Sequence, residues 1–133
     1  MSNAESSNTI AVLSWDKIHA DCDALAARIG RHGQWRGVIA VARGGLVPAA
    51  LIARALNVRL VEAITVAGYD HQTKGKLKIL SAFCPPEAGK DWLVIDDLSD
   101  TGRTFETLRS LMPAATFACA YVKPQGKPHV DFW

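Results

Sequence analysis

Short apolar runs that end abruptly in glycine or in charged residues most strongly limit how this chain can fold. One run covers residues 37–41 and ends just before Arg43-Gly44-Gly45, and another covers residues 92–95 and ends before Asp96-Asp97. Continuous apolar runs of this length are typical of parallel strands that are buried on both faces. Because segments with helical periodicity lie between them, the sequence predicts an α/β fold with a mainly parallel sheet flanked by helices.

The expected helices and strands alternate along the chain. Ser14 can cap a helix over residues 15–29, because apolar residues recur there at helical spacing. Further helices are expected over about 46–56 and from 101–104 to about 112, further strands over 58–66, 76–80 and 116–122, and a mobile loop over 67–75. The tryptophans at positions 15, 35 and 92 are expected to be packing residues or helix anchors.

Size and composition are those of an ordinary soluble domain. The 133 residues suit one domain, which we expect to span residues 9–133; residues 1–8 are expected to be a disordered tail, in which Ser2-Asn3-Ala4 resembles a cloning remnant. No apolar run approaches the ~18 residues needed to cross a bilayer, so no integral membrane segment is expected. The net charge of +2 comes from 15 basic and 13 acidic residues spread along the chain, which does not indicate a nucleic-acid partner.

The cysteines and histidines form no pattern that indicates a metal site. Cys22, Cys84 and Cys119 are far apart in the sequence, which argues against a disulfide framework or a zinc cluster. The four histidines share no ligand spacing, so a transition-metal site is not expected. Three separate cysteines fit a reducing, cytoplasmic location.

Polar residues follow three of the predicted strands at the point where each strand ends. They are Arg43-Gly44-Gly45, Asp96-Asp97 and Lys123, and in an open parallel sheet ligands collect beyond these carboxyl ends. Residues 101–104 open a helix, so their backbone N–H groups and two hydroxyls can surround a phosphate, and Gly102 permits a close approach. Taken alone, the acidic pair is more often a solvated turn and Thr101-Gly102-Arg103-Thr104 an ordinary cap, but their adjacency favours a binding site.

The stretch from Val94 to Thr104, which reads VIDDLSDTGRT, resembles the phosphoribosyl pyrophosphate motif of the type I phosphoribosyltransferases. The similarity extends to residues 41–48, 69–71 and 122–124, in the order found in the bacterial xanthine-guanine phosphoribosyltransferases, and covers nearly everything from residue 13 to 131. It implies the type I phosphoribosyltransferase fold and a Mg²⁺-dependent enzyme. This family normally continues into a hood segment over the purine, so with the chain ending at Trp133 we expect a C-terminally truncated protein with an incomplete hood, in which Trp133 either stands in as the stacking residue or is frayed.

The resemblance also implies roles for the residues that bind phosphoribosyl pyrophosphate. Asp96 and Asp97 would hold the ribose hydroxyls, with Asp97 also near the magnesium. Arg43 and the backbone of Gly44 would bind the pyrophosphate, where a glycine permits close approach and would tolerate a strained backbone. The residues implied for the 5′-phosphate are Asp100, Thr101, Gly102, Arg103 and Thr104.

In the loop that would close over the reactants, the sequence departs from the family pattern. Related enzymes often carry an arginine there, whereas Gly75 occupies the aligned position. The pyrophosphate role is therefore carried to Lys76, with Lys74 as a second candidate. A solvated stripe of lysines is an equally good interpretation.

For the purine, Lys123 matches the lysine that donates to the O6 oxygen, and this would select 6-oxopurines over adenine. Asp100 matches the acidic residue that meets the N7 proton and is the candidate general base. The implied reaction transfers the 5-phosphoribosyl group of phosphoribosyl pyrophosphate to N9 of xanthine or guanine, and less well of hypoxanthine. The alternatives are a regulatory protein that binds this sugar without turning it over, or transfer to another nucleobase; relatives commonly form dimers or tetramers, so a homo-oligomer is expected.

Overall fold

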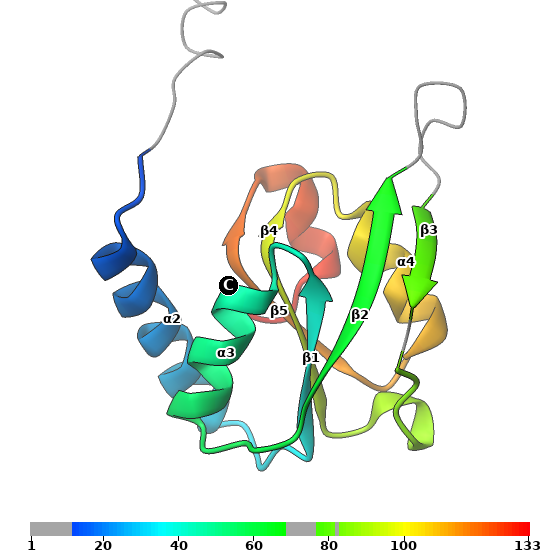
Figure 1. Cartoon of the computed structure of the whole chain (residues 1–133), viewed down its shortest axis with the longest axis horizontal. Coiled ribbons are helices and arrows are strands. Elements are labelled where there is room, and N and C mark those ends of the chain that lie inside the picture. Colours follow the sequence, from blue (N-terminus) through cyan, green and yellow to red (C-terminus); the bar gives the residue numbers. More distant parts are fainter. Residues whose placement is uncertain (1–11, 69–76, 82) are drawn as a thin grey trace, which may run out of the picture.

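A single five-stranded sheet forms the centre of the computed structural model, which describes residues 12–68, 77–81 and 83–133. The strands are β1 (Gly37–Ala42), β2 (Val61–Gly68), β3 (Leu77–Ser81), β4 (Trp92–Ser99) and β5 (Thr116–Val122). Their order is β3-β2-β1-β4-β5 (Figure 1), and the edge strand β3 is the antiparallel member. The predicted mainly parallel α/β sheet is therefore confirmed.

Helices cover the two faces of the sheet. They are α2 (Trp15–Gly30), α3 (Leu46–Ala55) and α4 (Arg103–Leu111), with the 3-10 helices η2 (Glu87–Gly89) and η3 (Pro124–His129). Alternate residues of β1 face opposite sides: Val38 and Ala40 pack with α2 and α3, whereas Ile39 and Val41 pack with α4. This burial on both faces explains why the strands are continuous apolar runs rather than alternating ones.

Two strand boundaries differ most from those predicted. The others shift by at most two residues, so that β2 reaches Gly68, inside the segment expected to be a loop. The second strand begins at Val61 rather than at residue 58, because Asn57 has a φ of 56° and the N–H of Val58 still donates to the carbonyl of Ala53 at the end of α3. The third buried strand continues past Ile95 to Ser99, since β4 keeps pairing with β5 up to Ser99 opposite Val122. The acidic pair therefore lies on a strand rather than in a loop.

Helix α2 begins where the sequence predicts it. The hydroxyl of Ser14 accepts a hydrogen bond of 3.1 Å from the N–H of Lys17, which satisfies one free donor of the first turn. Trp15 does not pack into the core, because 72% of its surface is exposed. Trp92 is buried in the core, as expected. Trp35 is partly buried and packs against the part of the core that contains α2, also as expected. None of the helices in the described ranges is both long and apolar enough to span a bilayer.

Arg109 joins α4 to the segment that follows η3. Its Nε and Nη2 atoms donate to the carbonyl of His129 at 3.1 and 2.9 Å, and Nη2 lies 2.9 Å from Oδ2 of Asp131. The guanidinium also lies 4.4 Å from the centre of the Phe117 ring in β5. One side chain thus holds helix, sheet and C-terminal segment together.

We expect Arg109→Met to lower the free energy of unfolding by about 1.5–3 kcal/mol, because the hydrogen bonds of a partly buried charged group are lost together. Urea denaturation monitored by circular dichroism measures this change. Arg54→Met is the matched control, since Arg54 is exposed at the end of α3, and should change the unfolding free energy by less than about 0.5 kcal/mol. Equal effects of the two changes would contradict the role of Arg109.

Candidate active site

The three polar strand ends of the sequence come together at one edge of the sheet. A Cβ atom placed on Gly44, in the turn after β1, would lie 2.4 Å from Oδ2 of Asp97 in β4. The backbone N–H of Lys123, just after β5, donates to the carbonyl of Ser99 at 2.9 Å. The loops after β1, β4 and β5 are therefore direct neighbours, as the parallel topology requires.

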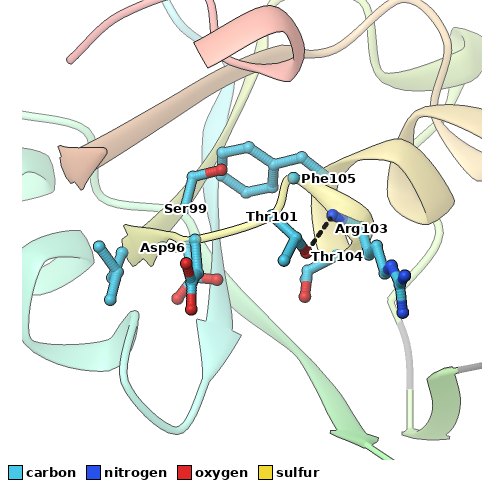
Figure 2. A pocket seen from close by; sticks show the side chains of 9 residues that line it. Asp96, Ser99, Thr101, Arg103, Thr104 and Phe105 are labelled. Carbon is cyan, nitrogen blue, oxygen red and sulfur yellow. Dashed lines mark hydrogen bonds between the residues drawn. The ribbon is translucent and has the colours of Figure 1, made fainter. Parts of the chain in front are cut away.

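The loop between β4 and α4 forms a small cup of about 100 Å³, which we call the loop cup. Gly102 has a φ of 88°, and the hydroxyl of Thr101 accepts from the N–H of Arg103 at 3.3 Å, where α4 begins. Figure 2 shows the Asp96 carboxylate, the Thr104 hydroxyl and the Arg103 guanidinium directed to one side of the loop, with the Phe105 ring on the other. The lining residues are Asp96, Leu98, Ser99, Asp100, Thr101, Gly102, Arg103, Thr104 and Phe105.

The loop cup is fixed from behind by packing and by one hydrogen bond. The buried ring of Phe105 meets the ring of Phe117 edge-on, with 5.1 Å between their centres. The hydroxyl of Ser99 donates to the carbonyl of Gly126 at 3.3 Å. A Cβ atom on Gly102 would lie 2.3 Å from Cδ2 of His129, so this position requires glycine for space as well as for its positive φ. The backbone N–H groups at the start of α4 are thus held in a fixed arrangement that suits an anion.

The two side chains of the acidic pair, Asp96 and Asp97, line different cavities. Asp96 lines the loop cup, whereas Asp97 lies against Gly44. The N–H of Asp97 donates to Oδ1 of Asp96, and the N–H of Leu98 donates to Oδ1 of Asp97, each at 2.8 Å. Burial, followed by the hydrogen bond with the neighbouring Asp97 carboxyl, raises the pKa of Asp96 to about 8. Hydroxyl donors or a cation would favour its ionised form.

Magnesium fits this donor set. Mg²⁺ keeps several of its waters and is usually held by one or two carboxylates together with substrate phosphates. Asp96 and Asp97 supply two carboxylates beside an anion cup, and in the described ranges no group of three or more His, Cys, Asp or Glu residues forms a cage for a metal. The site therefore suits a metal that arrives with a phosphorylated substrate.

An apolar cavity of about 570 Å³ lies beside the loop cup. Leu98 lines both spaces and is 41% exposed, a position that sequence reasoning missed. The signal was a leucine inside an otherwise polar stretch at a strand end. The residues that line the apolar cavity are Leu13, Trp15, Ile18, Gly44, Val47, Pro48, Asp97, Leu98, Ala120, Tyr121, Val122 and Lys123.

Lys123 and Asp100 face each other between the loops that follow β4 and β5. Nζ of Lys123 lies 3.4 Å from Oδ1 of Asp100, and more than half of each side chain is exposed. Lys123 lines the apolar cavity and Asp100 lines the loop cup, so this ion pair stands where the two spaces meet. The arrangement presents one cation and one carboxylate side by side to anything that enters the cavity.

Other predicted site residues are placed differently. Arg43 is exposed in the turn after β1 and lines neither the loop cup nor the apolar cavity. Gly44 does not have a positive φ, so the expected strained backbone is not found there. Glycine is needed at this position because a side chain would collide with the Asp97 carboxylate. Lys76, the loop around it and the N-terminal tail expected over residues 1–8 lie outside the described residues.

Trp133 lies away from both spaces. Its carbonyl accepts from Arg28 in α2, and its ring centre lies 5.8 Å from Nζ of Lys127. Trp133 lines neither the loop cup nor the apolar cavity.

Comparisons with known proteins found a matching family model, similar sequences and similar folds. The family model described as the phosphoribosyl transferase domain matches residues 11–133. The xanthine-guanine phosphoribosyltransferase of Desulfotalea psychrophila is 48% identical over 120 residues, which are 90% of this chain and 74% of that protein. The solved purine phosphoribosyltransferase of Pyrococcus horikoshii is similar with a TM-score of 0.70 and 30% identity, over 85% of this chain and 78% of the other. The Helicobacter pylori xanthine-guanine-hypoxanthine phosphoribosyltransferase shares the fold, with a TM-score of 0.72 and 23% identity over 86% of this chain and 79% of that one.

Proposed function

The chain belongs to the phosphoribosyltransferase family, and from that premise we propose that it transfers the 5-phosphoribosyl group of phosphoribosyl pyrophosphate to N9 of a 6-oxopurine. Xanthine and guanine are the preferred bases and hypoxanthine a poorer one, so the products are XMP or GMP and pyrophosphate, as in purine salvage. The observation that carries this proposal is the Lys123–Asp100 pair, which stands 3.4 Å apart beside an anion cup. The name of the relative from Desulfotalea psychrophila supports the choice of bases.

The loop cup is the proposed site of the 5′-phosphate. Backbone N–H groups at the start of α4 and the hydroxyls of Thr101 and Thr104 offer hydrogen-bond donors at the positive end of the helix. Asp96 and Asp97 bind the ribose hydroxyls, and Asp97 is also the proposed ligand of Mg²⁺. When bound, the metal supplies positive charge to the pyrophosphate oxygens.

The ion pair of Lys123 and Asp100 recognises the edge of the purine that carries O6 and N7. A 6-oxopurine carrying a proton on N7 presents an acceptor at O6 and a donor at N7 on one edge, which complement the ammonium of Lys123 and the carboxylate of Asp100. Adenine presents an amino group at position 6, so it would face the ammonium with a donor and is rejected. Leu98, exposed between the two spaces, offers an apolar surface to the ring.

The reaction exchanges two bonds at the ribose C1. The bond between C1 and a pyrophosphate oxygen breaks and its electron pair leaves with pyrophosphate, while N9 of the purine forms the new bond and Asp100 accepts the N7 proton. Positive charge grows at C1 and negative charge on the leaving group as this happens. Arg43 and Lys76 are the proposed side-chain partners of that leaving group.

Release of pyrophosphate tests the proposal directly. The protein is mixed with phosphoribosyl pyrophosphate, Mg²⁺ and one base, and we expect turnover with xanthine and guanine, slower turnover with hypoxanthine and none with adenine. If calorimetry detects binding of phosphoribosyl pyrophosphate but no pyrophosphate is released with any base, the chain is a regulatory protein that binds this sugar rather than an enzyme.

We expect Lys123→Met to raise the KM for guanine by about ten- to a hundred-fold, which corresponds to losing a hydrogen bond from a charged donor. The KM for phosphoribosyl pyrophosphate should stay within about two-fold. Selectivity should also relax, because the ammonium no longer opposes the amino group of adenine. Steady-state kinetics with guanine and with adenine measure the effect. An unchanged ratio of kcat/KM for guanine to kcat/KM for adenine would contradict it.

We also propose that residues 9–133 act as one domain in the cytoplasm, as a homo-oligomer of two or four chains. The three well-separated cysteines support a reducing compartment. Light scattering of the purified protein measures the solution mass. A monomer at the working concentration would contradict the oligomer.

A further inference from the structure

The phenol of Tyr121 joins the end of β5 to helix α2. Its hydroxyl donates a hydrogen bond of 2.8 Å to Oδ2 of Asp21, a residue 100 positions earlier in the chain. Nζ of Lys17 lies 3.1 Å from the same oxygen, one helical turn before Asp21. Within the ranges that the structure describes, no other side-chain hydrogen bond links α2 to β5.

The charges of this contact favour the hydrogen bond at neutral pH. The hydrogen bond from Tyr121, and after it the one from Lys17, lowers the pKa of Asp21, which keeps the carboxylate ionised. Burial, and after it the Asp21 carboxylate, raises the pKa of Tyr121 to about 12, which keeps the phenol protonated. A neutral donor therefore meets an ionised acceptor, a combination stronger than a neutral pair.

On the side away from β4, β5 pairs with Phe132 through the N–H of Cys119, and Ala120 packs against the cluster that contains α2. Among the described residues, however, only Tyr121 gives β5 a side-chain hydrogen bond to α2. β5 is an edge strand whose sheet neighbour is β4. The N–H of Lys123 donates to the carbonyl of Ser99, which fixes the side toward β4. The Tyr121 phenol supplies the corresponding fixed point on the side toward α2, two residues before Lys123.

Tyr121 and Lys123 also share a space. Both line the apolar cavity, together with Trp15 and Ile18 of α2. A shift of the β5 end away from α2 would widen this cavity and would move the base of the Lys123 side chain. Lysine has four rotatable bonds, so the position of its ammonium depends on where the backbone that carries it is held.

We propose that Tyr121 and Asp21 are positioning residues for Lys123: their hydrogen bond holds the end of β5 against α2, so that the ammonium reaches the carbonyl oxygen of the base. The inference rests on the proposed function and deepens it, because it assigns the geometry of purine recognition to a contact outside the loop cup. Neither residue takes part in the transfer step. Their removal should therefore change the binding of the purine and leave the sugar donor and the chemistry alone.

The test compares Tyr121→Phe and Asp21→Ala, which remove the donor and the acceptor of this hydrogen bond, with the wild-type protein. We expect each change to raise the KM for guanine about five- to ten-fold, as the loss of one hydrogen bond allows. kcat and the KM for phosphoribosyl pyrophosphate should stay within about two-fold. Because both changes break the same bond, the double variant should be no worse than either single one.

Lys17→Met is the matched control, since it removes the other partner of Asp21 but no link between α2 and β5. It should leave all three kinetic constants within about two-fold, as expected for an exposed pair within one helix. If Tyr121→Phe fails to fold, Asp21→Ala carries the test, and Asp21→Glu, which keeps a carboxylate acceptor, should recover part of the lost affinity.

Two results overturn the positioning role. One is a variant that lowers the melting temperature but leaves the KM for guanine unchanged, and the other is an equal rise in the KM for the base and for the sugar donor. Failure of the proposed function looks different, because the wild-type protein itself would then release no pyrophosphate with any 6-oxopurine.

Discussion

Asp100→Asn should slow turnover by about ten- to ten-thousand-fold while the protein stays folded. The asparagine can still accept a hydrogen bond from the N7–H of the purine, but it cannot take up the proton as the new bond forms. The Asp100 carboxylate is more than half exposed and stands 3.4 Å from Nζ of Lys123, so the change removes a charge from the site without leaving a buried polar group unpaired. Rapid-quench measurement of the first turnover separates this chemical step from product release.

Asp91→Asn is the matched control, because Asp91 lies just before β4, at the end opposite to Asp100. It has a φ of 63°, a conformation that asparagine also accepts, so the same chemical change should leave both stability and rate nearly unaltered. A single-turnover rate of Asp100→Asn equal to that of Asp91→Asn would remove Asp100 from the mechanism.

Much of the fold could be predicted because its strands are buried on both faces. The runs at residues 37–41 and 92–95 are apolar throughout, and they became the adjacent strands β1 and β4. The end of β4 could not be predicted, because it depends on pairing between distant segments. Nothing local distinguishes residues 96–99 from a loop, and they are extended because β5 pairs with them.

The candidate site could be predicted only where one short segment carries it. Residues 96–104 are contiguous, and the predicted cup is their local backbone shape. The contact between Gly44 and Asp97, the exposed face of Leu98 and the hydrogen bond from Tyr121 to Asp21 each depend on how elements far apart in the chain are packed. The exposure of Trp15 has the same origin, since helical periodicity does not show which residues of the first turn reach the core.

Gly44→Ala should reduce kcat/KM for phosphoribosyl pyrophosphate by about a hundred-fold, the effect expected when catalytic groups are displaced by about an ångström. The added methyl carbon would lie 2.4 Å from Oδ2 and 2.7 Å from Oδ1 of Asp97, closer than nonbonded atoms approach. The carboxylate has to move, and with it the proposed ligand of the ribose and of Mg²⁺. Initial rates at varied sugar and Mg²⁺ concentrations measure the loss.

The protein should nonetheless keep its fold, because the atoms that the methyl group meets are the end of an exposed side chain. At Gly45 they are backbone atoms instead, with the carbonyl oxygens of Ile95 and Val41 at 2.5 and 2.6 Å, so Gly45→Ala should lower the melting temperature strongly. Gly30→Ala, whose methyl group meets only the tip of Leu56 at 3.2 Å, is the neutral control. If Gly44→Ala lost stability as Gly45→Ala does, or kept its rate as Gly30→Ala should, the close approach of the β1 loop to Asp97 would serve the fold rather than the site.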